Sequence, residues 1–152
     1  MSSSGAMTHE TNQREAPTGA LLLQDLTLVF TDIAASTAKV EQFGNREWLA
    51  MLSAHHRIVR RRTAEFGGVE STALGDGFLL VFESLEPALR CVEAIQGDLR
   101  RRAAANPEHE IHVRVGIHTG ETIVAPDGSL VGRDVHLASR VVDQADGGEV
   151  VV

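Results

Sequence analysis

The sequence contains a single cysteine, Cys91, and therefore cannot form an internal disulfide. Because this thiol falls within an apolar helical pattern, we predict a buried structural residue in a reducing compartment, the cytoplasm. Long apolar runs are also missing: none approaches the length that a bilayer span needs, so we expect no membrane segment in this chain.

Positive charge is scarce as well. The chain carries 14 Lys and Arg against 21 Asp and Glu, a net charge of −7, which argues against a nucleic-acid partner because phosphate binding draws on a basic surface. Two arginine runs, Arg60 to Arg62 and Arg100 to Arg102, lie near the ends of helical patterns. We interpret them as solvated helix ends that suit the helix dipole, not as a binding patch.

What the chain does have suits one globular domain: 43% of its 152 residues are apolar. Residues 1–20 are the exception, because almost all of them are polar or small and no signal-peptide core is present, so we expect a disordered leader or in part a cloning remnant. The domain then covers 21–152. Its apolar end, residues 150–152, predicts a strand whose partner is missing, as in a domain truncated at its C-terminus.

One stretch near the start of the domain combines a strand with a carboxylate. Leu26 to Phe30 reads as a buried strand, Asp32 follows directly, and Ser36 and Thr37 are candidate N-caps of a helix. A helix N-terminus offers unpaired N–H groups and a positive dipole end, so a triphosphate can lie there while Asp32 holds its metal. The simpler alternative is that Asp32 only caps the helix.

A second carboxylate, Asp76, stands at a predicted hairpin tip. Strand patterns over 69–74 and 78–82 flank Gly75-Asp76-Gly77, and Asp-Gly is a strong tight-turn signal, so Asp76 can also be read as a turn residue alone. If the first strand lies beside this hairpin, however, Asp32 and Asp76 face each other. Two carboxylates at such a short distance repel each other unless cations lie between them, so this arrangement predicts a divalent metal.

The order of predicted elements gives the fold class. Strand, helices, strand, strand, helix and strand follow one another, as in the split β-α-β arrangement of ferredoxin-like domains. We therefore predict an α+β fold, a βαββαβ antiparallel sheet with helices packed on it. The helices are expected over 34–43, 45–66, 84–105 and 132–144, and the last strand of the unit over 111–119.

Histidines within these helices differ in their predicted roles. His55 and His56 are adjacent on helix 45–66 and point about 100° apart, so we read them as core or surface residues and not as ligands of one ion. In contrast, His136 and Arg140 stand four apart in the predicted helix 132–144 and share one face.

Five short motifs occur in a fixed order along the chain: Phe30-Thr31-Asp32-Ile33 with Ser36-Thr37, then Gly67-Gly68, Leu74-Gly75-Asp76-Gly77-Phe78, Val115-Gly116-Ile117-His118-Thr119-Gly120, and Gly132 with Val135 to Arg140. Together they resemble the class III adenylate/guanylate cyclase catalytic domain, over roughly 26–152. The resemblance implies the class III nucleotide cyclase fold and the conversion of ATP or GTP to a 3′,5′-cyclic monophosphate and pyrophosphate.

The resemblance also assigns residues. It implies that Asp32 and Asp76 bind two divalent ions, Mg²⁺ or Mn²⁺, with the backbone of Ile33 near a metal, and that Arg140 stabilises the transition state. It implies that a short loop cradles the triphosphate: Ala34, Ala35, Ser36 and Thr37. In that family the site forms between two chains of a head-to-tail homodimer, with the metals on one chain and the arginine on the other.

Three positions depart from the family pattern. Thr72 stands where a lysine commonly reads the purine, Ser129 where the second purine-reading residue is usually aspartate or threonine, and His136 where an asparagine orients the ribose. Thr72 and Ser129 can each donate or accept, so neither base is excluded, and His136 can still donate one hydrogen bond. We therefore predict a cyclase of low activity and relaxed specificity that uses ATP more readily than GTP.

Two other functions remain open from the sequence. A catalytically silent cyclase-homology module would dimerise or bind nucleotide to regulate a partner, and the substitutions at Thr72 and His136 favour it. A purely structural ferredoxin-like interaction domain would need neither Asp32 nor Asp76, so it would show no metal-dependent nucleotide binding at all.

Overall fold

A computed structural model describes residues 20–74, 76–131, 145, 148 and 150–152. The elements in chain order are β1 (Leu22–Ile33), α1 (Ser36–Glu65), β2 (Val69–Leu74), β3 (Gly77–Phe82), α2 (Leu85–Ala105), the 3₁₀ turn η1 (Pro107–His109), β4 (Val113–Val124), β5 (Leu130–Val131) and β6 (Val150–Val151). The helix predicted over 132–144 lies outside the described residues, as does all of the leader predicted over residues 1–20 except residue 20.

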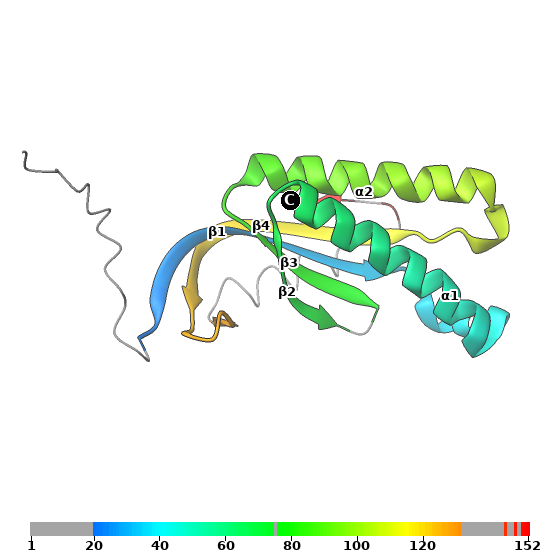
Figure 1. The fold of residues 1–152 in the computed structure, drawn as a ribbon, viewed down its shortest axis with the longest axis horizontal. Coiled ribbons are helices and arrows are strands. Elements are labelled where there is room, and N and C mark those ends of the chain that lie inside the picture. The colour runs from blue at the N-terminus through cyan, green and yellow to red at the C-terminus, as the bar shows by residue number, and fades with distance from the viewer. Residues whose placement is uncertain (1–19, 75, 132–144, 146–147, 149) are drawn as a thin grey trace, which may run out of the picture.

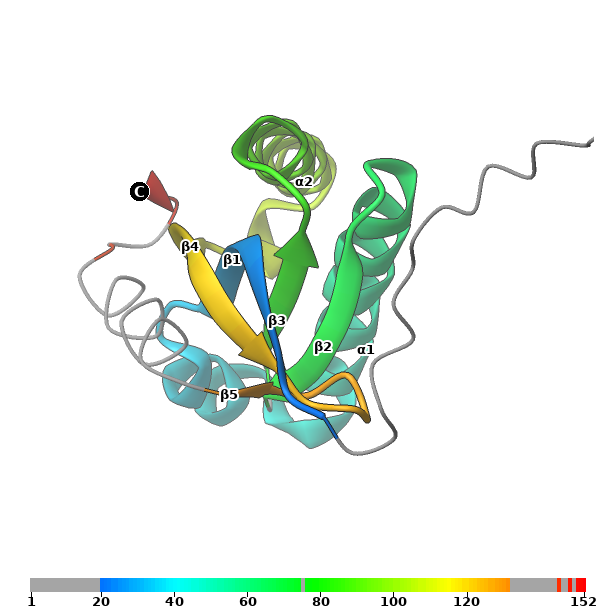
Figure 2. The same cartoon turned by 90° about the vertical axis from the view of Figure 1, so that its left-hand side faces the viewer.

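The strands form one sheet in the order β2-β3-β1-β4-β5, with β6 paired to β4 (Figure 1). The pairs among β1 to β5 are antiparallel, and only β6 among the described strands runs parallel to its neighbour β4. Figure 2 shows α1 and α2 on the same face of this sheet. The predicted ferredoxin-like α+β arrangement is confirmed.

Side chains of β1 alternate between the two faces of the sheet. Val29 and Ile33 belong to the large core between sheet and helices, whereas Leu26, Leu28 and Phe30 form a second apolar cluster on the other face, with Leu79 of β3. We call this second side, which neither of the described helices α1 and α2 covers, the open face. Asp32 continues the even-numbered series of β1 and so belongs to the open face.

Helix α1 is broken where the sequence predicts a break. Gly44 has φ 77° and ψ 169°, a left-handed conformation that glycine adopts without steric cost. The start of the helix differs from the prediction, however. Ala35, with φ 55°, occupies the N-cap position and no side chain caps the helix, so the assignment of Ser36 or Thr37 as the cap is wrong.

Helix α2 corresponds to the helix predicted over 84–105 and begins one residue after Ser84. Ser84 takes the N-cap position but its hydroxyl makes no capping hydrogen bond. Cys91 on this helix is fully buried, and burial raises the pKa of its thiol to about 11, so the thiol stays protonated at neutral pH as expected of a structural residue. Neither described helix is both long and apolar enough to cross a membrane.

His55 lies in the core of the domain against Phe78. Its side chain is fully buried, and no described residue hydrogen-bonds either ring nitrogen. Burial, and secondarily the nearby His56, lower the pKa of His55 to about 4. Of the two predicted alternatives, a core or a surface histidine, His55 is therefore a core residue, and it is neutral at pH 7.

We expect His55 to make the domain sensitive to acid. In the unfolded chain its pKa returns to about 6.5, so the unfolded state binds the extra proton between pH 6.5 and 4. Stability is fully present above pH 6.5 and falls as the pH drops to 4, by about 3 kcal/mol from this group. His55→Leu should remove that part of the slope in urea unfolding, whereas His112→Gln, at an exposed position, should not; equal slopes in wild type and His55→Leu would contradict this.

Candidate functional site

The two carboxylates predicted to share a metal come from β1, which holds Asp32, and from the turn just before the neighbouring strand β3, which holds Asp76. Thr31 of β1 pairs with Phe78 of β3 in antiparallel register, so Asp32, one residue after Thr31, and Asp76, two residues before Phe78, lie beyond the same end of this ladder. Gly77 makes this approach possible, since a Cβ there would stand 2.1 Å from the carbonyl oxygen of Thr31 and 3.3 Å from the Asp32 Cα. Only a glycine fits this close a backbone contact. The backbone that carries Asp76 therefore passes close to the backbone at Asp32.

Arg114 is a further member of this site. It lies opposite Asp32 in the β1–β4 register, and its guanidinium donates two hydrogen bonds, Nε to Oδ1 at 2.7 Å and Nη2 to Oδ2 at 2.6 Å. Both side chains remain about 30% exposed, at 30% and 28%, so solvent and ligands can reach the pair. A planar guanidinium beside a carboxylate fixes its orientation and adds positive charge to the site.

The loop that follows Asp32 leads into the start of α1. The Ala34 amide donates to the carbonyl of His112 at 2.8 Å, which ties the loop to the residue before β4. Since no side chain caps α1 and its first turn contains no acidic residue, the amides of this turn keep their hydrogen-bonding capacity and positive dipole. The predicted phosphate-binding residues Ala34, Ala35, Ser36 and Thr37 thus form a helix N-terminus suited to an anion.

His56 of α1 lies within electrostatic reach of Asp76. Partial burial and the charge of Arg60 lower the pKa of His56, while the carboxylates of Glu70 and Asp76 act in the opposite direction. The His56 ring also packs edge-on against Phe78 at 4.9 Å between centroids. These contacts link α1 to the hairpin that carries Asp76, which holds the hairpin in place.

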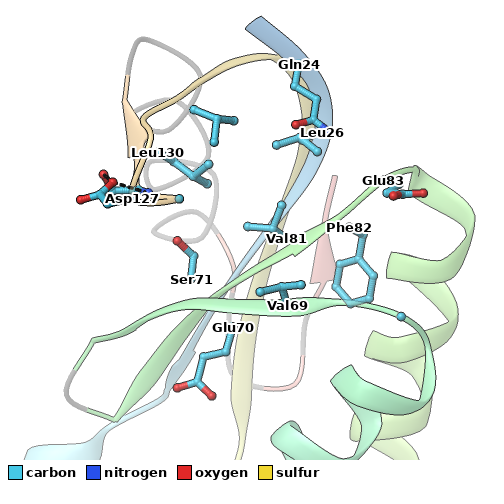
Figure 3. Close-up of a pocket in the computed structure, with 14 residues that line it drawn as sticks. Gln24, Leu26, Val69, Glu70, Ser71, Val81, Phe82, Glu83, Asp127 and Leu130 are labelled. Atoms are coloured by element: carbon cyan, nitrogen blue, oxygen red, sulfur yellow. Dashed lines mark hydrogen bonds between the residues drawn. The ribbon is translucent and has the colours of Figure 1, made fainter. Parts of the chain in front are cut away.

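A cavity of about 490 Å³ opens on the open face, nearer the other end of the sheet (Figure 3). Its floor is apolar and its rim includes hydroxyls and carboxylates. The lining residues that matter here are Leu26, Val69, Ser71, Val81, Asp127 and Ser129. The volume falls in the range of small-molecule sites, and no lysine or arginine is among the described residues that line it.

Ser129 lies on the rim of this cavity, in the turn between β4 and β5. Its amide and hydroxyl both donate to Asp127 Oδ1, at 2.9 and 2.5 Å, and these bonds lower the pKa of Asp127. The Ser129 hydroxyl is therefore engaged as a donor, and the acceptor nearest to it on the rim is the Asp127 carboxylate.

The other predicted site residues are only partly placed. The Thr72 backbone pairs with Leu79 in the β2–β3 ladder, next to a register shift between Glu70 and Thr72, while its side chain lies outside the described residues. His136 and Arg140 also lie outside them. Arg114 and Asp127 were missed by sequence reasoning; the signal for Arg114 was a charged residue at a polar position of the alternating pattern of 111–119.

Comparison with known proteins identifies relatives of this domain. A family model for the adenylate and guanylate cyclase catalytic domain matches residues 21–152. The chain is 32% identical over 128 residues to the serine/threonine-protein kinase pkn2 of Myxococcus xanthus, and 30% identical over 160 residues to an adenylate cyclase of Podospora anserina. The matches cover 84% and 90% of this chain but only 15% and 7% of those proteins.

Solved structures of the same fold are also similar. The adenylyl cyclase CyaB from P. aeruginosa matches with a TM-score of 0.76 at 21% identity, covering 86% of this chain and 77% of that one. An adenylate/guanylate cyclase/hydrolase from Silicibacter pomeroyi gives 0.76 at 24% identity, over 86% and 76% of the two chains. Family match, fold and motif order agree, and the chain belongs to the class III adenylate and guanylate cyclase catalytic domain family.

Proposed function

We propose that this domain converts a purine nucleoside triphosphate, ATP more readily than GTP, to the 3′,5′-cyclic monophosphate and pyrophosphate. The observation that supports the proposal is the close approach of the β3 backbone to β1 at Gly77, the residue next to Asp76, beside the pair of Asp32 and Arg114. A purely structural domain has no need of two carboxylates, a guanidinium and an uncapped helix N-terminus at one end of its sheet.

Asp32 and Asp76 suit Mg²⁺ or Mn²⁺. Among the described residues no group of three or more His, Cys, Asp or Glu side chains gathers, so the site resembles no zinc or calcium cage. Two carboxylates, with the backbone of Ile33, leave coordination positions for water and phosphate oxygens, which is how Mg²⁺ is usually held at nucleotide sites. When bound, two such ions would lower the pKa of the ribose 3′ hydroxyl and neutralise the leaving pyrophosphate.

Other residues of the chain bind the triphosphate, orient Asp32 and stabilise the transition state. The loop from Ala34 to Thr37 binds the triphosphate through the amides that follow Ala34, since the Ala34 amide already donates to His112. Arg114 keeps Asp32 oriented and adds a cation next to it. Arg140 meets the negative charge that develops on the α-phosphorus, and His136 donates a hydrogen bond to a ribose oxygen. Thr72 and Ser129 face the base.

We further propose that the active form is a head-to-tail homodimer. Leu26, which lines the open-face cavity, is six residues from Asp32, about 20 Å along β1. A base in that cavity is therefore far from the same chain's Asp32, whereas a second chain packed head to tail brings its own metal-binding end to the cavity. Arg140 and His136 would then serve the partner's Asp32 and Asp76.

The three substituted positions argue for low activity. Loss of a charged purine contact weakens binding by about 1.5–3 kcal/mol when nothing replaces it, but leaves the metal-binding carboxylates intact. The alternative is a silent cyclase-homology module that dimerises or binds nucleotide for regulation. It is favoured by Ser129, whose hydroxyl already donates to Asp127.

Turnover and nucleotide binding together decide among the cyclase, the silent module and the structural interaction domain. The protein should convert ATP, and GTP more slowly, to cyclic nucleotide with Mn²⁺ or Mg²⁺, measured by chromatography of the product. Metal-dependent nucleotide binding without product indicates the silent module. If the protein neither binds nor converts nucleotide, the structural interaction domain is the correct description.

The selectivity of this site between ATP and GTP depends on the two positions that are proposed to contact the base. Thr72 and Ser129 are short and neutral, so discrimination between ATP and GTP should be poor. Thr72→Lys with Ser129→Asp should favour ATP by about 1–3 kcal/mol in kcat/KM, because the ammonium donates to adenine N1 and the carboxylate accepts from the exocyclic amine. The single variants are the controls. An unchanged kcat/KM ratio in the double variant means that these positions do not face the base.

A further inference from the structure

A groove between α1 and α2 lies on the helical layer, on the other side of the sheet from Asp32. It has a volume of about 430 Å³ and is lined by Ala54, Arg57, Ile58, Arg61 and Arg102. Three of these five residues are arginines, in a chain whose net charge is −7. Its floor is apolar, because Ala54 is only 3% exposed and Ile58 packs against the core.

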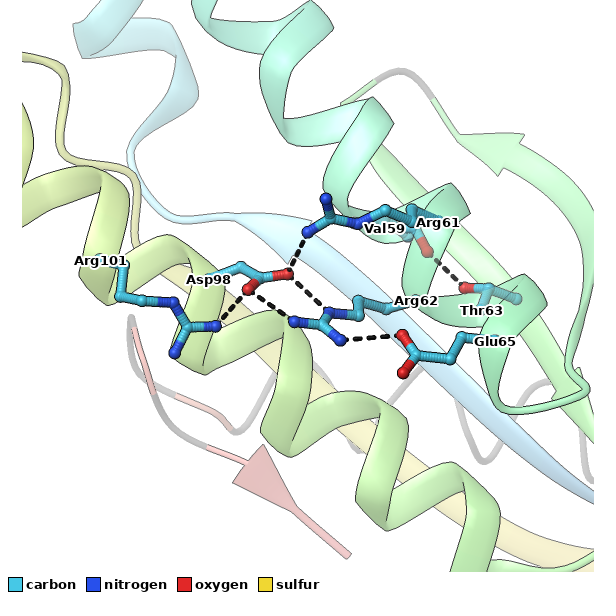
Figure 4. A network of polar contacts seen from close by, with 7 residues as sticks. All are labelled: Val59, Arg61, Arg62, Thr63, Glu65, Asp98 and Arg101. Carbon is cyan, nitrogen blue, oxygen red and sulfur yellow. Dashed lines mark hydrogen bonds and ion pairs between the residues drawn. The ribbon is translucent and has the colours of Figure 1, made fainter.

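One buried carboxylate organises the arginines at this groove (Figure 4). Asp98 of α2 is 8% exposed and accepts hydrogen bonds from Arg61 at 3.0 Å, from Arg62 at 2.7 and 2.9 Å, and from Arg101. These guanidinium groups, Arg62 first, hold the pKa of Asp98 well below its usual range. The two arginine runs are therefore packed against each other across the helix pair, and their interpretation as solvated helix ends was incomplete.

Negative charge at this cluster falls short of the positive charge. Arg62 has a second partner in Glu65 at 2.8 Å, but no described carboxylate pairs with Arg57 or Arg102. The five arginines Arg57, Arg61, Arg62, Arg101 and Arg102 thus meet two carboxylates, which leaves a net charge of +3. In addition, the Nε of Arg102 is buried and no described residue accepts its hydrogen bond.

We propose that this groove binds a phosphate-type anion of two or more charges. Guanidinium groups bind such oxyanions through paired, charge-assisted hydrogen bonds, and an anion here would offset the excess charge. The volume exceeds that of one phosphate group and suits pyrophosphate or a small organic phosphate above the apolar floor. Asp98 holds the guanidinium of Arg61, a residue that lines the groove, through a hydrogen bond of 3.0 Å, which lowers the entropy that Arg61 loses when an anion binds.

Calorimetric titration with inorganic pyrophosphate, in EDTA and at low salt, tests the proposal without metal or turnover. Wild type should bind, and added NaCl should weaken binding because the contacts are ionic. Arg57→Gln and Arg102→Gln should each weaken binding at least about tenfold, and Arg57→Lys less than Arg57→Gln. Arg57 is exposed, so its substitution should leave the fold intact, which circular dichroism checks.

Two control variants separate this groove from other cations. Arg90→Gln removes an exposed arginine of α2 that pairs with Glu86, and it should bind pyrophosphate as wild type does. Arg114→Gln removes the cation beside Asp32 and should also retain binding. If Arg114→Gln abolishes binding while Arg57→Gln does not, the anion belongs to the cyclase site and the proposal is overturned.

The source of the phosphate group is distinguished by a second arm. Sedimentation with phosphatidylcholine vesicles, with and without phosphoinositides, shows whether a lipid headgroup supplies the same chemistry. Binding to free pyrophosphate, or to phosphoinositide vesicles, that depends on Arg57 supports the groove. Absence of both, or binding that is equal in wild type and Arg57→Gln, overturns it.

Discussion

Asp32→Ala and Asp76→Ala should each abolish metal-dependent nucleotide binding and lower cyclase turnover by roughly a thousandfold, about 4 kcal/mol of transition-state stabilisation. The physical reason is that the proposed metal site relies on these two carboxylates, so the loss of either would remove half of the charged protein ligands of the metals. Affinity for Mn²⁺-nucleotide by calorimetry and initial rates of product formation are the two measurements.

Asp25→Ala is the matched control for both variants. Asp25 lies on the same strand and is also a carboxylate, but it is exposed and pairs in register with Glu121, seven residues before Asp32. Its loss should change neither nucleotide affinity nor rate. All variants should unfold at nearly the wild-type urea concentration, since Asp32 is partly exposed. Unchanged Mn²⁺-dependent affinity in Asp32→Ala would falsify the metal assignment.

Mixing two inactive variants should restore activity if the site is shared between chains. In an equal mixture of Asp32→Ala and Arg140→Ala proteins, half of the dimers combine one chain of each, and each mixed dimer has one intact site. We therefore expect about a quarter of the wild-type rate per chain, measured after the subunits have exchanged. Each variant alone should remain inactive.

A second mixture shows whether recovery reflects a shared site. Asp32→Ala with Asp76→Ala places both defects at the metal-binding end, so every site in the mixed dimer still lacks one carboxylate and no activity should return. Equal recovery in both mixtures points to an unrelated effect such as stabilisation by mixing. No recovery in the first mixture, with dimers present by sedimentation, contradicts a site built from two chains.

Much of this fold could be predicted because its signals are local. The apolar run from Leu26 to Phe30, the Asp-Gly turn at Asp76 and the glycine break at Gly44 each depend on a few neighbouring residues, and the structure contains all three features. Helix starts were less predictable. Ser36 and Ser84 look like caps in sequence, but capping depends on backbone angles that tertiary contacts set, such as the bond from the Ala34 amide to His112.

The site was predictable only as far as its motifs reach. The neighbourhood of Asp32 and Asp76 follows from strand order, but Arg114 becomes a partner of Asp32 only through the register of two strands far apart in sequence. Likewise, the bond between Ser129 and Asp127 depends on the form of one turn. The basic groove was missed because its charge excess comes from two helices whose relative placement no local pattern specifies.

The long ladder between β1 and β4 also affects how the protein is made. Asp32 and Arg114 are 82 residues apart, so β1 emerges from the ribosome well before its partner exists. At about 5–20 residues per second, this delay is on the order of 4 to 16 s. Once β3 has emerged it can pair with one edge of β1, but until β4 emerges the unpaired N–H and C=O groups of the other edge stay open to other chains. Folding dominated by such distant contacts is slow, so the nascent domain should benefit from a chaperone until β4 has paired and the Asp32–Arg114 pair has formed.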